Sequence, residues 1–283
     1  MSRASVVILT MGDRPESLAE AIGSVRSQDY GVELIVVGNG CRPTVGDAAV
    51  RVLTTETNVG VSAGRNLGWG AATGDVAFFL DDDARYASPS LVAQAMRRFD
   101  ADPRLAVISF RIADESGRAI SKHMPMLVKR PDRITKVTTF LGGACAIRHS
   151  VIGQVGGFPE EFFYALEETD LSWRLLDAGW SIEYAGDLGV IHPAMPLSHR
   201  AGAVQNTARN RVLLARRRLP VPVAVAYLLV RGLMSLGTIR SVGDFRALLR
   251  GYRAGFRDPA GERQPMRWRT AWRMTRLGRP PLI

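Results

Sequence analysis

Cysteine is scarce in this chain, whose 283 residues include only Cys41 and Cys145. Neither has metal-ligand spacing and the two make no disulfide framework, so we expect a reducing compartment. Long apolar runs are missing as well. Residues 6–9 are too few for a signal-peptide core, and the longest later run, 221–230, falls well short of the roughly 20 residues of a membrane-spanning helix. These absences predict a cytoplasmic protein without a membrane crossing.

Acidic residues are scarce in the last quarter of the chain. Residues 207–283 hold 17 Lys and Arg against 3 Asp and Glu, a net charge of +14, whereas residues 1–206 carry −4. No recognisable nucleic-acid-binding module accompanies this charge, so we expect no nucleic-acid partner. Arginines alternate with apolar segments and with Trp268 and Trp272, which is typical of helices on an anionic bilayer. The pattern predicts peripheral membrane contact through 207–283, at the inner face of the cell membrane; a solvated scaffold for an acceptor site is the alternative.

Strand and helix patterns alternate through the first two-thirds of the chain. β-Branched runs at 4–10 and 32–39 enclose a helical pattern that begins at Pro15, which predicts a β-α-β unit. Continued alternation predicts an α/β fold with a mainly parallel central sheet flanked by helices, and ligands at the carboxyl ends of the strands. The polar segment 113–133 predicts a loop. Further strands are expected at 50–55, 75–82, 105–112, 181–185 and 188–192, and further helices at 62–72, 91–99 and 167–179.

The chain changes character near residue 202. Beyond it, helical segments are separated by prolines and by a turn at 241–243. We therefore expect an α/β domain at 1–202 and a basic helical region at 203–283. Helices in the second region are expected at 206–218, 223–237 and 244–256.

Three consecutive carboxylates, Asp81, Asp82 and Asp83, follow the apolar strand segment 76–80. Like charges this close repel, and burial raises the cost, so the arrangement is unfavourable unless a cation or hydrogen-bond donors lie nearby. Such a cluster suits Mg²⁺ or Mn²⁺, which bind oxygen ligands and keep positions for substrate phosphates. The pattern predicts metal-diphosphate binding; a solvated acidic turn is the alternative.

A glycine-rich segment precedes these aspartates. Asn58, Gly60 and Arg65 lie at a predicted helix start, where small residues and free backbone N–H groups let an anion approach. Arg65 would either pair with the aspartates or hold a phosphate. Ordinary helix capping is the alternative explanation.

Acidic residues also open the helix predicted at 167–179. The helix dipole favours negative charge there, and capping accounts for one or two of Glu167, Glu168 and Asp170. A third carboxylate is available as a general base for an incoming hydroxyl. His192, at the end of an apolar strand, is either a metal ligand or a packed neutral imidazole.

Taken in order, these segments resemble family 2 glycosyltransferases of the GT-A fold over residues 4–192. The segments that carry the resemblance are a first strand followed by Thr10, Arg14 and Pro15, then NVGVSAGRNLG, ATGDVAFFLDDD, GGACAIR, EETDLSWRLLDAGW and VIH. The resemblance implies that a sugar moves, with inversion, from a nucleoside diphosphate sugar to an acceptor hydroxyl, assisted by a divalent cation. The acceptor would be a saccharide, a lipid-linked or cell-envelope glycan, or a small molecule.

The resemblance also implies residue roles. Asp81 and Asp83 correspond to the acidic metal motif, with His192 as the third metal-side residue. Glu168 corresponds to the usual base, Asp170 is the second choice, and Glu167 remains open. The turn at Gly142 and Gly143 would face the donor sugar. The other donor-binding residues would be Thr10, Arg14, Asn39, Asn58, Gly60, Arg65, Asp81 and Asp82.

Two positions depart from the family pattern. Gly38 stands where an Asp usually helps to read the nucleotide base, with Asn39 as a substitute, so the donor nucleotide is open. Glu168 stands where Asp is commoner. Two rival functions are a sugar nucleotidyltransferase, which would have a Gly-rich loop with lysine near the N-terminus, and a non-catalytic membrane-surface module, in which the acidic positions would be lost. A dinucleotide-dependent dehydrogenase is excluded by the absence of Gly-x-Gly-x-x-Gly after the first strand.

Overall fold

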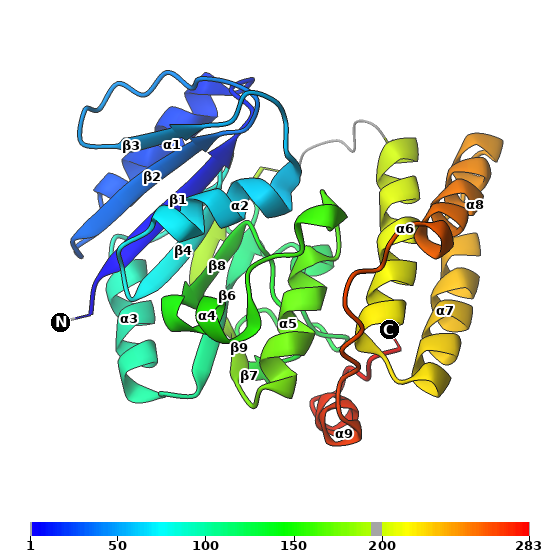
Figure 1. Cartoon of the computed structure of the whole chain (residues 1–283). Coiled ribbons are helices and arrows are strands. Elements are labelled where there is room, and N and C mark those ends of the chain that lie inside the picture. Colours follow the sequence, from blue (N-terminus) through cyan, green and yellow to red (C-terminus); the bar gives the residue numbers. More distant parts are fainter. Residues whose placement is uncertain (1, 194–199, 283) are drawn as a thin grey trace.

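The computed structural model describes residues 2–193 and 200–282, and within them a mixed sheet of nine strands forms the centre of the molecule (Figure 1). The strands are β1 (Ala4–Thr10), β2 (Val32–Gly38), β3 (Arg51–Thr54), β4 (Val76–Asp81), β5 (Arg85–Tyr86), β6 (Leu105–Ala113), β7 (Ile134–Val137), β8 (Ala144–Arg148) and β9 (Ser181–Ile191). They lie in the order β3-β2-β1-β4-β8-β6-β9-β5, and β7 pairs with β9. Strands β1 to β4 pair in parallel, whereas β8 runs antiparallel to both β4 and β6.

Helices cover both faces of this sheet. They are α1 (Pro15–Arg26), α2 (Gly60–Ala71), α3 (Leu91–Ala101), α4 (Ile152–Val155) and α5 (Glu167–Asp177). Because successive side chains of a strand point to opposite faces, β1 contributes to two cores. Val6 and Ile8 pack with α1 and α3, whereas Val7 packs with Trp69 of α2 and with α5. The apolar runs of the sequence therefore form strands that are buried on both sides.

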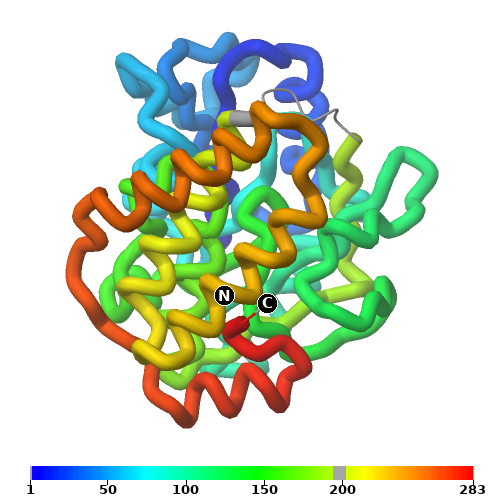
Figure 2. The backbone as a smooth tube through the Cα atoms, turned by 90° about the vertical axis from the view of Figure 1, so that its right-hand side faces the viewer, coloured from blue at the N-terminus to red at the C-terminus, as the bar shows by residue number. Residues whose placement is uncertain are grey.

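The C-terminal region is helical and extends the second core. It consists of α6 (Arg200–Arg218), α7 (Val221–Leu236), α8 (Val242–Arg257) and α9 (Trp268–Arg276). Leu213 of α6 and Tyr227 of α7 lie in the same buried cluster as α5, and the rings of Tyr227 and Trp173 meet edge to face with centroids 6.0 Å apart. Helices α7 and α8 form the outer surface on this side (Figure 2). None of the helices in the described residues has the length and apolar character needed to cross a membrane.

Most elements agree with the sequence prediction, and the α/β fold class with a helix-flanked sheet is confirmed. Two predictions are wrong. The sheet is mixed and not mainly parallel, because β8 is antiparallel to β4 and β6, and β9 is antiparallel to β5 and β7. The two short strands expected at 181–185 and 188–192 are the single strand β9. The intervening Gly186 and Asp187 coincide with a register shift in the pairing of β9 with β6, so they make an irregularity within a strand and not a turn. Helices α4 and α9 and strands β5, β7 and β8 have no counterpart among the predicted elements. The domain division at residue 202 stays a prediction.

Two helical glycines differ in the space around them. An added Cβ at Gly255 of α8 would lie 2.6 Å from both the Arg209 carbonyl oxygen and Val212 Cβ of α6, whereas Gly23 of α1 has no atom beyond its own helix within 4 Å. We expect Gly255→Ala to lower the free energy of unfolding by about 1–3 kcal/mol through overpacking. The control Gly23→Ala should raise it by about 0.5–1 kcal/mol, because alanine favours helix. Urea unfolding measures both, and equal effects would contradict the close packing of α6 and α8.

Candidate active site

A cavity of about 590 Å³ opens at the carboxyl ends of β1, β2 and β4. The starts of α2 and α5 and the segment before β8 form its other walls. This is the edge of the sheet at which the sequence predicts ligand binding. The predicted site residues that line the cavity are Thr10, Arg14, Asn39, Asn58, Gly60, Arg65, Asp81, Asp82, Gly142, Gly143, Glu168 and His192.

Asp81, Asp83 and His192 come together beside this cavity. His192 Nε2 lies 3.2 Å from Asp83 Oδ1 and 3.7 Å from Asp81 Oδ2, and ligand atoms of the three side chains all lie within 4.8 Å of one another. His192 Nδ1 is 2.8 Å from the Pro193 carbonyl oxygen, so Nδ1 carries a hydrogen and Nε2 faces the carboxylates. Two carboxylates and one imidazole nitrogen with its second nitrogen bonded in this way fit a divalent cation.

The electrostatics of this group point to the same conclusion. The Asp81 carboxylate and, after it, Asp83 raise the pKa of His192 to about 9 despite the burial of the ring. Although burial opposes its ionisation, Asp81 has a pKa lowered to about 2 by His192 and Arg65. The two carboxylates thus favour a positive charge at Nε2, which a proton or a metal ion can supply.

Arg14 compensates the charges of Asp82 and Asp83 in the triple-aspartate turn. It lies directly before α1, and its Nη2 is 2.8 Å from Asp82 Oδ1 while Nη1 pairs with Asp83. Asp82 is 2% exposed, and burial raises its pKa to about 6 even though Thr10 and Arg14 favour the ionised form. Arg14 and Asp82 therefore line the cavity as a pair and hold the turn in place.

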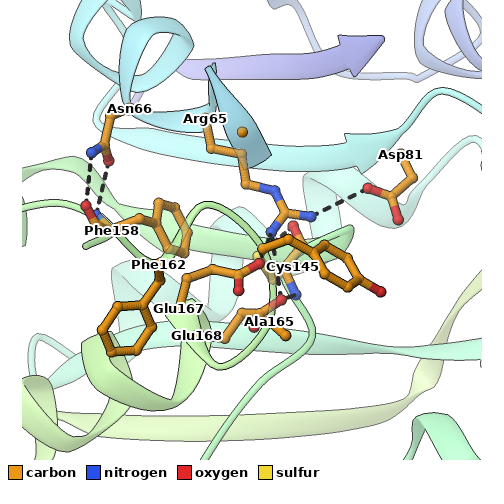
Figure 3. Close-up of polar contacts among 12 residues, drawn as sticks. Arg65, Asn66, Asp81, Cys145, Phe158, Phe162, Ala165, Glu167 and Glu168 are labelled. Atoms are coloured by element: carbon orange, nitrogen blue, oxygen red, sulfur yellow. Dashed lines mark hydrogen bonds and ion pairs between the residues drawn. The ribbon is translucent and has the colours of Figure 1, made fainter. Parts of the chain in front are cut away.

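Arg65 is the buried cation at the centre of the site (Figure 3). Its guanidinium contacts three carboxylates: Nη2 lies 3.3 Å from Asp81 Oδ1, and Nη1 lies 3.3 Å from Glu167 Oε1 and 3.5 Å from Glu168 Oε1. Burial works against the charged form, but these carboxylates raise the pKa of Arg65 above its ordinary value. Arg65 thus connects Asp81, one of the three candidate metal ligands, to the start of α5.

Gly142 and Gly143 are required by these charged side chains. A Cβ at Gly142 would overlap the Arg65 guanidinium and lie 2.6 Å from Glu168 Oε1, and a Cβ at Gly143 would overlap the Asp81 carboxylate. The Gly142 N–H also donates to Glu168 Oε1 at 3.2 Å. The turn lines the cavity as predicted, and its glycines leave room for the charged groups behind it.

Glu167 and Glu168 differ in their access to the cavity. The Glu167 side chain is 3% exposed and that of Glu168 is 22% exposed. Burial, followed by the charge of Glu168, raises the pKa of Glu167 well above its ordinary range, although Arg65 opposes this. Glu167 therefore tends to hold a proton, whereas Glu168 is the carboxylate with access to the cavity.

Asn39 and Asn58 line the cavity beside the turn that leads into α2. Asn39 Nδ2 donates to Asn58 Oδ1 at 3.0 Å, and Asn39 Oδ1 accepts from the Val59 N–H at 2.8 Å. Asn58 Oδ1 also accepts from the Gly60 N–H at 2.9 Å. Gly60 has a φ of +86°, and a Cβ there would lie 2.6 Å from the Phe163 carbonyl oxygen. These amides hold the turn that leads into α2.

Asp170 lies outside the cavity. It is fully buried, and its carboxylate is 2.7 Å from both Arg174 Nε and Arg218 Nε. Arg218 belongs to α6, which packs beside α5. Its two arginine partners make Asp170 an ion-pair residue between helices, without access to an acceptor in the cavity.

The turn before α5 carries lining residues that sequence reasoning does not identify. Phe163, Tyr164 and Ala165 line the cavity, as does His123 from the loop at 113–133. Phe163, Ala165 and Leu166 have φ values of 60°, 75° and 69°. Each such non-glycine conformation costs on the order of 1–3 kcal/mol and persists only where surrounding contacts enforce it. No glycine or asparagine in the sequence marks this turn.

Comparison with known sequences identifies related proteins. Residues 5–156 match the family model described as Glycosyl transferase family 2. The chain is 26% identical over 258 residues to the pre-mycofactocin glycosyltransferase of Mycobacterium tuberculosis, an alignment that covers 83% of this chain and 53% of that protein. A stretch of 75 residues is 39% identical to the N-acetylglucosaminyl-diphospho-decaprenol L-rhamnosyltransferase of the same organism and covers 24% of each chain. The chain thus spans about half the length of the first relative.

Comparison with solved structures supports the fold. The crystal structure of GalNAc-T7 with UDP, GalNAc and Mn²⁺ superposes with a TM-score of 0.65 and 14% sequence identity, covering 89% of this chain and 55% of that one. At this identity the likeness concerns the fold alone. It confirms the GT-A-type fold expected from the sequence.

Removal of Arg65 tests the charge balance of the site. We expect Arg65→Met to lower the free energy of unfolding by about 3–5 kcal/mol, because it leaves buried carboxylates without a cation. Adding Glu167→Gln to this variant should recover part of the loss. Arg26→Met, which breaks the half-exposed pair of Arg26 with Asp47, is the control and should change stability little. Chemical unfolding at neutral pH measures all three, and a small effect of Arg65→Met would contradict the central role of this residue.

Proposed function

The chain belongs to glycosyl transferase family 2, and from this premise we propose that it transfers a sugar from a nucleoside diphosphate sugar to an acceptor hydroxyl with inversion at the anomeric carbon. The family and the GT-A-type fold predicted from the sequence are confirmed, and glycosyltransferase activity is the function proposed from them. The observation that carries the finer proposal is the position of Arg65. Arg65 contacts both Asp81, one of the candidate metal ligands, and Glu168, and all three residues line one cavity.

Asp81, Asp83 and His192 would hold a divalent cation, Mg²⁺ or Mn²⁺. Their donor atoms fit this role, and the solved structure of GalNAc-T7 contains Mn²⁺ together with UDP. A bound cation would neutralise charge that develops on the departing diphosphate. Arg65 adds a second, permanent positive charge at the same wall of the cavity.

Glu168 is the proposed base. It accepts the proton of the acceptor hydroxyl while the acceptor oxygen bonds to the anomeric carbon and the bond from that carbon to the diphosphate breaks on the opposite side. Arg65 and the Gly142 N–H both contact Glu168 Oε1, and these two contacts fix the position of the carboxylate. Glu167 is the weaker candidate, because burial keeps its proton in place.

The remaining cavity residues are proposed to bind the donor. Thr10 ends β1, Asn39 follows β2 and Asn58 precedes α2. Their side chains offer a hydroxyl and two amide groups at the cavity. Arg14 and Asp82 hold the triple-aspartate turn against α1. Gly60, Gly142 and Gly143 allow the walls of this proposed donor site to pack closely, because a Cβ at each position would meet Phe163, Arg65 or Asp81.

The function is tested by a screen of UDP-, dTDP- and GDP-sugars with Mn²⁺ or Mg²⁺. We expect one donor class to release nucleoside diphosphate slowly without acceptor, and chelation of the metal to abolish this release. Glu168→Gln should retain donor binding by calorimetry and lose about 10²–10⁴ in turnover. The exposed Glu16 of α1 supplies the control, since Glu16→Gln should leave turnover unchanged. Full turnover by Glu168→Gln would remove the assignment of the base.

We further propose that the acceptor is lipid-linked or belongs to a cell-envelope glycan. Helix α7 presents an apolar stripe to the outside, with Val221, Val225, Leu229 and Leu233 between 55% and 69% exposed. The opposite side of α7 packs on the core through Tyr227. A relative of this chain is named as acting on N-acetylglucosaminyl-diphospho-decaprenol, a lipid-linked acceptor.

Helix α8 adds a second apolar strip and a row of arginines. Phe245, Leu249 and Phe256 are exposed, whereas Leu248 and Gly251 face α6. The two helices are neighbours, since a Cβ at Gly232 of α7 would lie 3.6 Å from Tyr252 Oη of α8. Apolar strips bordered by cations fit the interface of an anionic bilayer, where each arginine contributes about 1 kcal/mol. The exposed arginines of α8 are Arg246, Arg250, Arg253 and Arg257.

Vesicle sedimentation tests this surface. We expect the protein to sediment with phosphatidylglycerol vesicles at low salt, to be released by high salt, and to leave phosphatidylcholine vesicles unbound. Leu229→Glu combined with Leu233→Glu should abolish sedimentation. Leu67→Glu, at an exposed position of α2, is the control. Failure to bind anionic vesicles, or a dimer in lipid-free solution that the α7 variant disrupts, would contradict the membrane assignment.

A further inference from the structure

Helix α6 contacts the turn that leads into the proposed base. Asn210 of α6 is completely buried, and its amide nitrogen lies 2.9 Å, 2.9 Å and 2.8 Å from the carbonyl oxygens of Phe162, Tyr164 and Ala165. A side-chain amide has two hydrogens to donate, so three carbonyls share one donor group. One side chain from the C-terminal region thus holds three of the four carbonyl groups of the turn at 162–165.

This turn is strained and ends at the helix that carries the base. Phe163, with a φ of 60° and a ψ of −57°, is the central residue of a γ-turn in which the Tyr164 N–H donates to the Phe162 carbonyl at 2.5 Å. Ala165 and Leu166 follow with positive φ, and Glu167 and Glu168 begin α5 immediately afterwards. Relaxation of the turn would therefore displace the start of α5.

The turn is held from the opposite side by the start of α2. The Val61 N–H donates to the Phe163 carbonyl at 2.6 Å, beside Gly60. The Phe163 carbonyl held by Val61 lies between the Phe162 and Tyr164 carbonyls held by Asn210. The turn is thus clamped between a cavity wall proposed to bind the donor and the C-terminal helix.

Neighbouring side chains of α6 orient the Asn210 amide. Arg209 Nη1 donates to Asn210 Oδ1 at 3.1 Å and to the Glu161 carbonyl at 2.8 Å, while Arg209 Nε is 2.5 Å from Asp258 Oδ2 of the segment after α8. The oxygen of the Asn210 amide is therefore occupied, and its nitrogen faces the turn. Arg217 lies about two helical turns beyond Asn210 on α6. Its guanidinium carbon is 5.6 Å from the centroid of the Phe162 ring.

We propose that Asn210 is a positioning residue for sugar transfer: by holding the carbonyls of the 162–165 turn it sets the place of Glu168 in the cavity. This inference rests on the proposed function of Glu168 as the base. It gives the C-terminal region a part in catalysis through α6, which also carries the packing of α8. Asn210 itself does not line the cavity, so its effect reaches the acceptor only through the turn.

The test compares Asn210→Leu, which keeps the approximate shape and removes both donors, with Asn210→Ser, which is smaller and keeps one hydroxyl donor. Ser235→Ala is the matched control, because the Ser235 hydroxyl is buried in the C-terminal helices and contacts Arg211 and the Arg231 carbonyl, away from the turn. We expect Asn210→Leu to lower kcat at least about tenfold, because misplacing a reacting group costs rate. The donor KM should stay within about twofold of wild type, since donor-side residues are unchanged.

Hydrogen exchange provides a readout that does not depend on activity. The Val61 and Asp170 amides donate to the carbonyls of Phe163 and Leu166, the first and the last of the strained residues. Both amides should exchange faster in Asn210→Leu, to a smaller degree in Asn210→Ser, and at the wild-type rate in Ser235→Ala. Thermal unfolding and circular dichroism confirm that each variant is folded.

The outcomes separate this inference from the proposed function. A folded Asn210→Leu variant with wild-type exchange at Val61 and Asp170 and an unchanged kcat would overturn the positioning role. If Asn210→Leu does not fold, Asn210→Ser decides in the same way, and rapid exchange of both amides in the wild-type protein would also overturn it. Should no donor be turned over by the wild-type protein, the proposed function fails, while the exchange comparison still decides whether Asn210 holds the turn.

Discussion

Charge compensation at the carboxyl edge of the sheet is the constraint on which the rest of the site depends. Carboxylates from the end of β4 and from the start of α5 meet around one cavity, and each would be costly to bury alone. Arg14 compensates the turn after β4, and Arg65 connects Asp81 with Glu168. His192 faces the remaining position, where a proton or a divalent cation balances the charge. The same arrangement that makes the carboxylates tolerable thus forms the proposed catalytic site.

Close packing of backbone against these charges explains several glycines. Gly142 and Gly143 leave room for Arg65 and Asp81, and Gly60 lies against the Phe163 backbone. Any side chain at Gly142 or Gly143 would displace a charged group, so the arrangement of charges in the site requires both glycines. The turn before α5 differs, because three of its residues adopt left-handed conformations although they carry a Cβ. Contacts from both sides hold them there.

The C-terminal helices connect two aspects of the protein. Their inner surface joins the core of the α/β domain through Leu213 and Tyr227 and holds the turn before α5 through Asn210. Their outer surface presents the apolar stripe of α7 and the arginines of α8. A bilayer contact on that surface would connect the proposed catalytic cavity to the membrane through α6, which packs beside both α5 and α8.

The sequence by itself determined most of the strands and helices, the triple-aspartate turn and the glycosyltransferase family, because periodicity and ordered motifs are properties of contiguous residues. It also placed His192 at the end of a strand, and the tertiary structure brings its imidazole to Asp81 and Asp83. Only the tertiary structure decided that Asp170 is paired with Arg218 while Glu168 reaches the cavity, and that Asn210 holds the turn. These contacts join residues far apart in the chain and depend on left-handed turns without glycine, for which local sequence carries no signal.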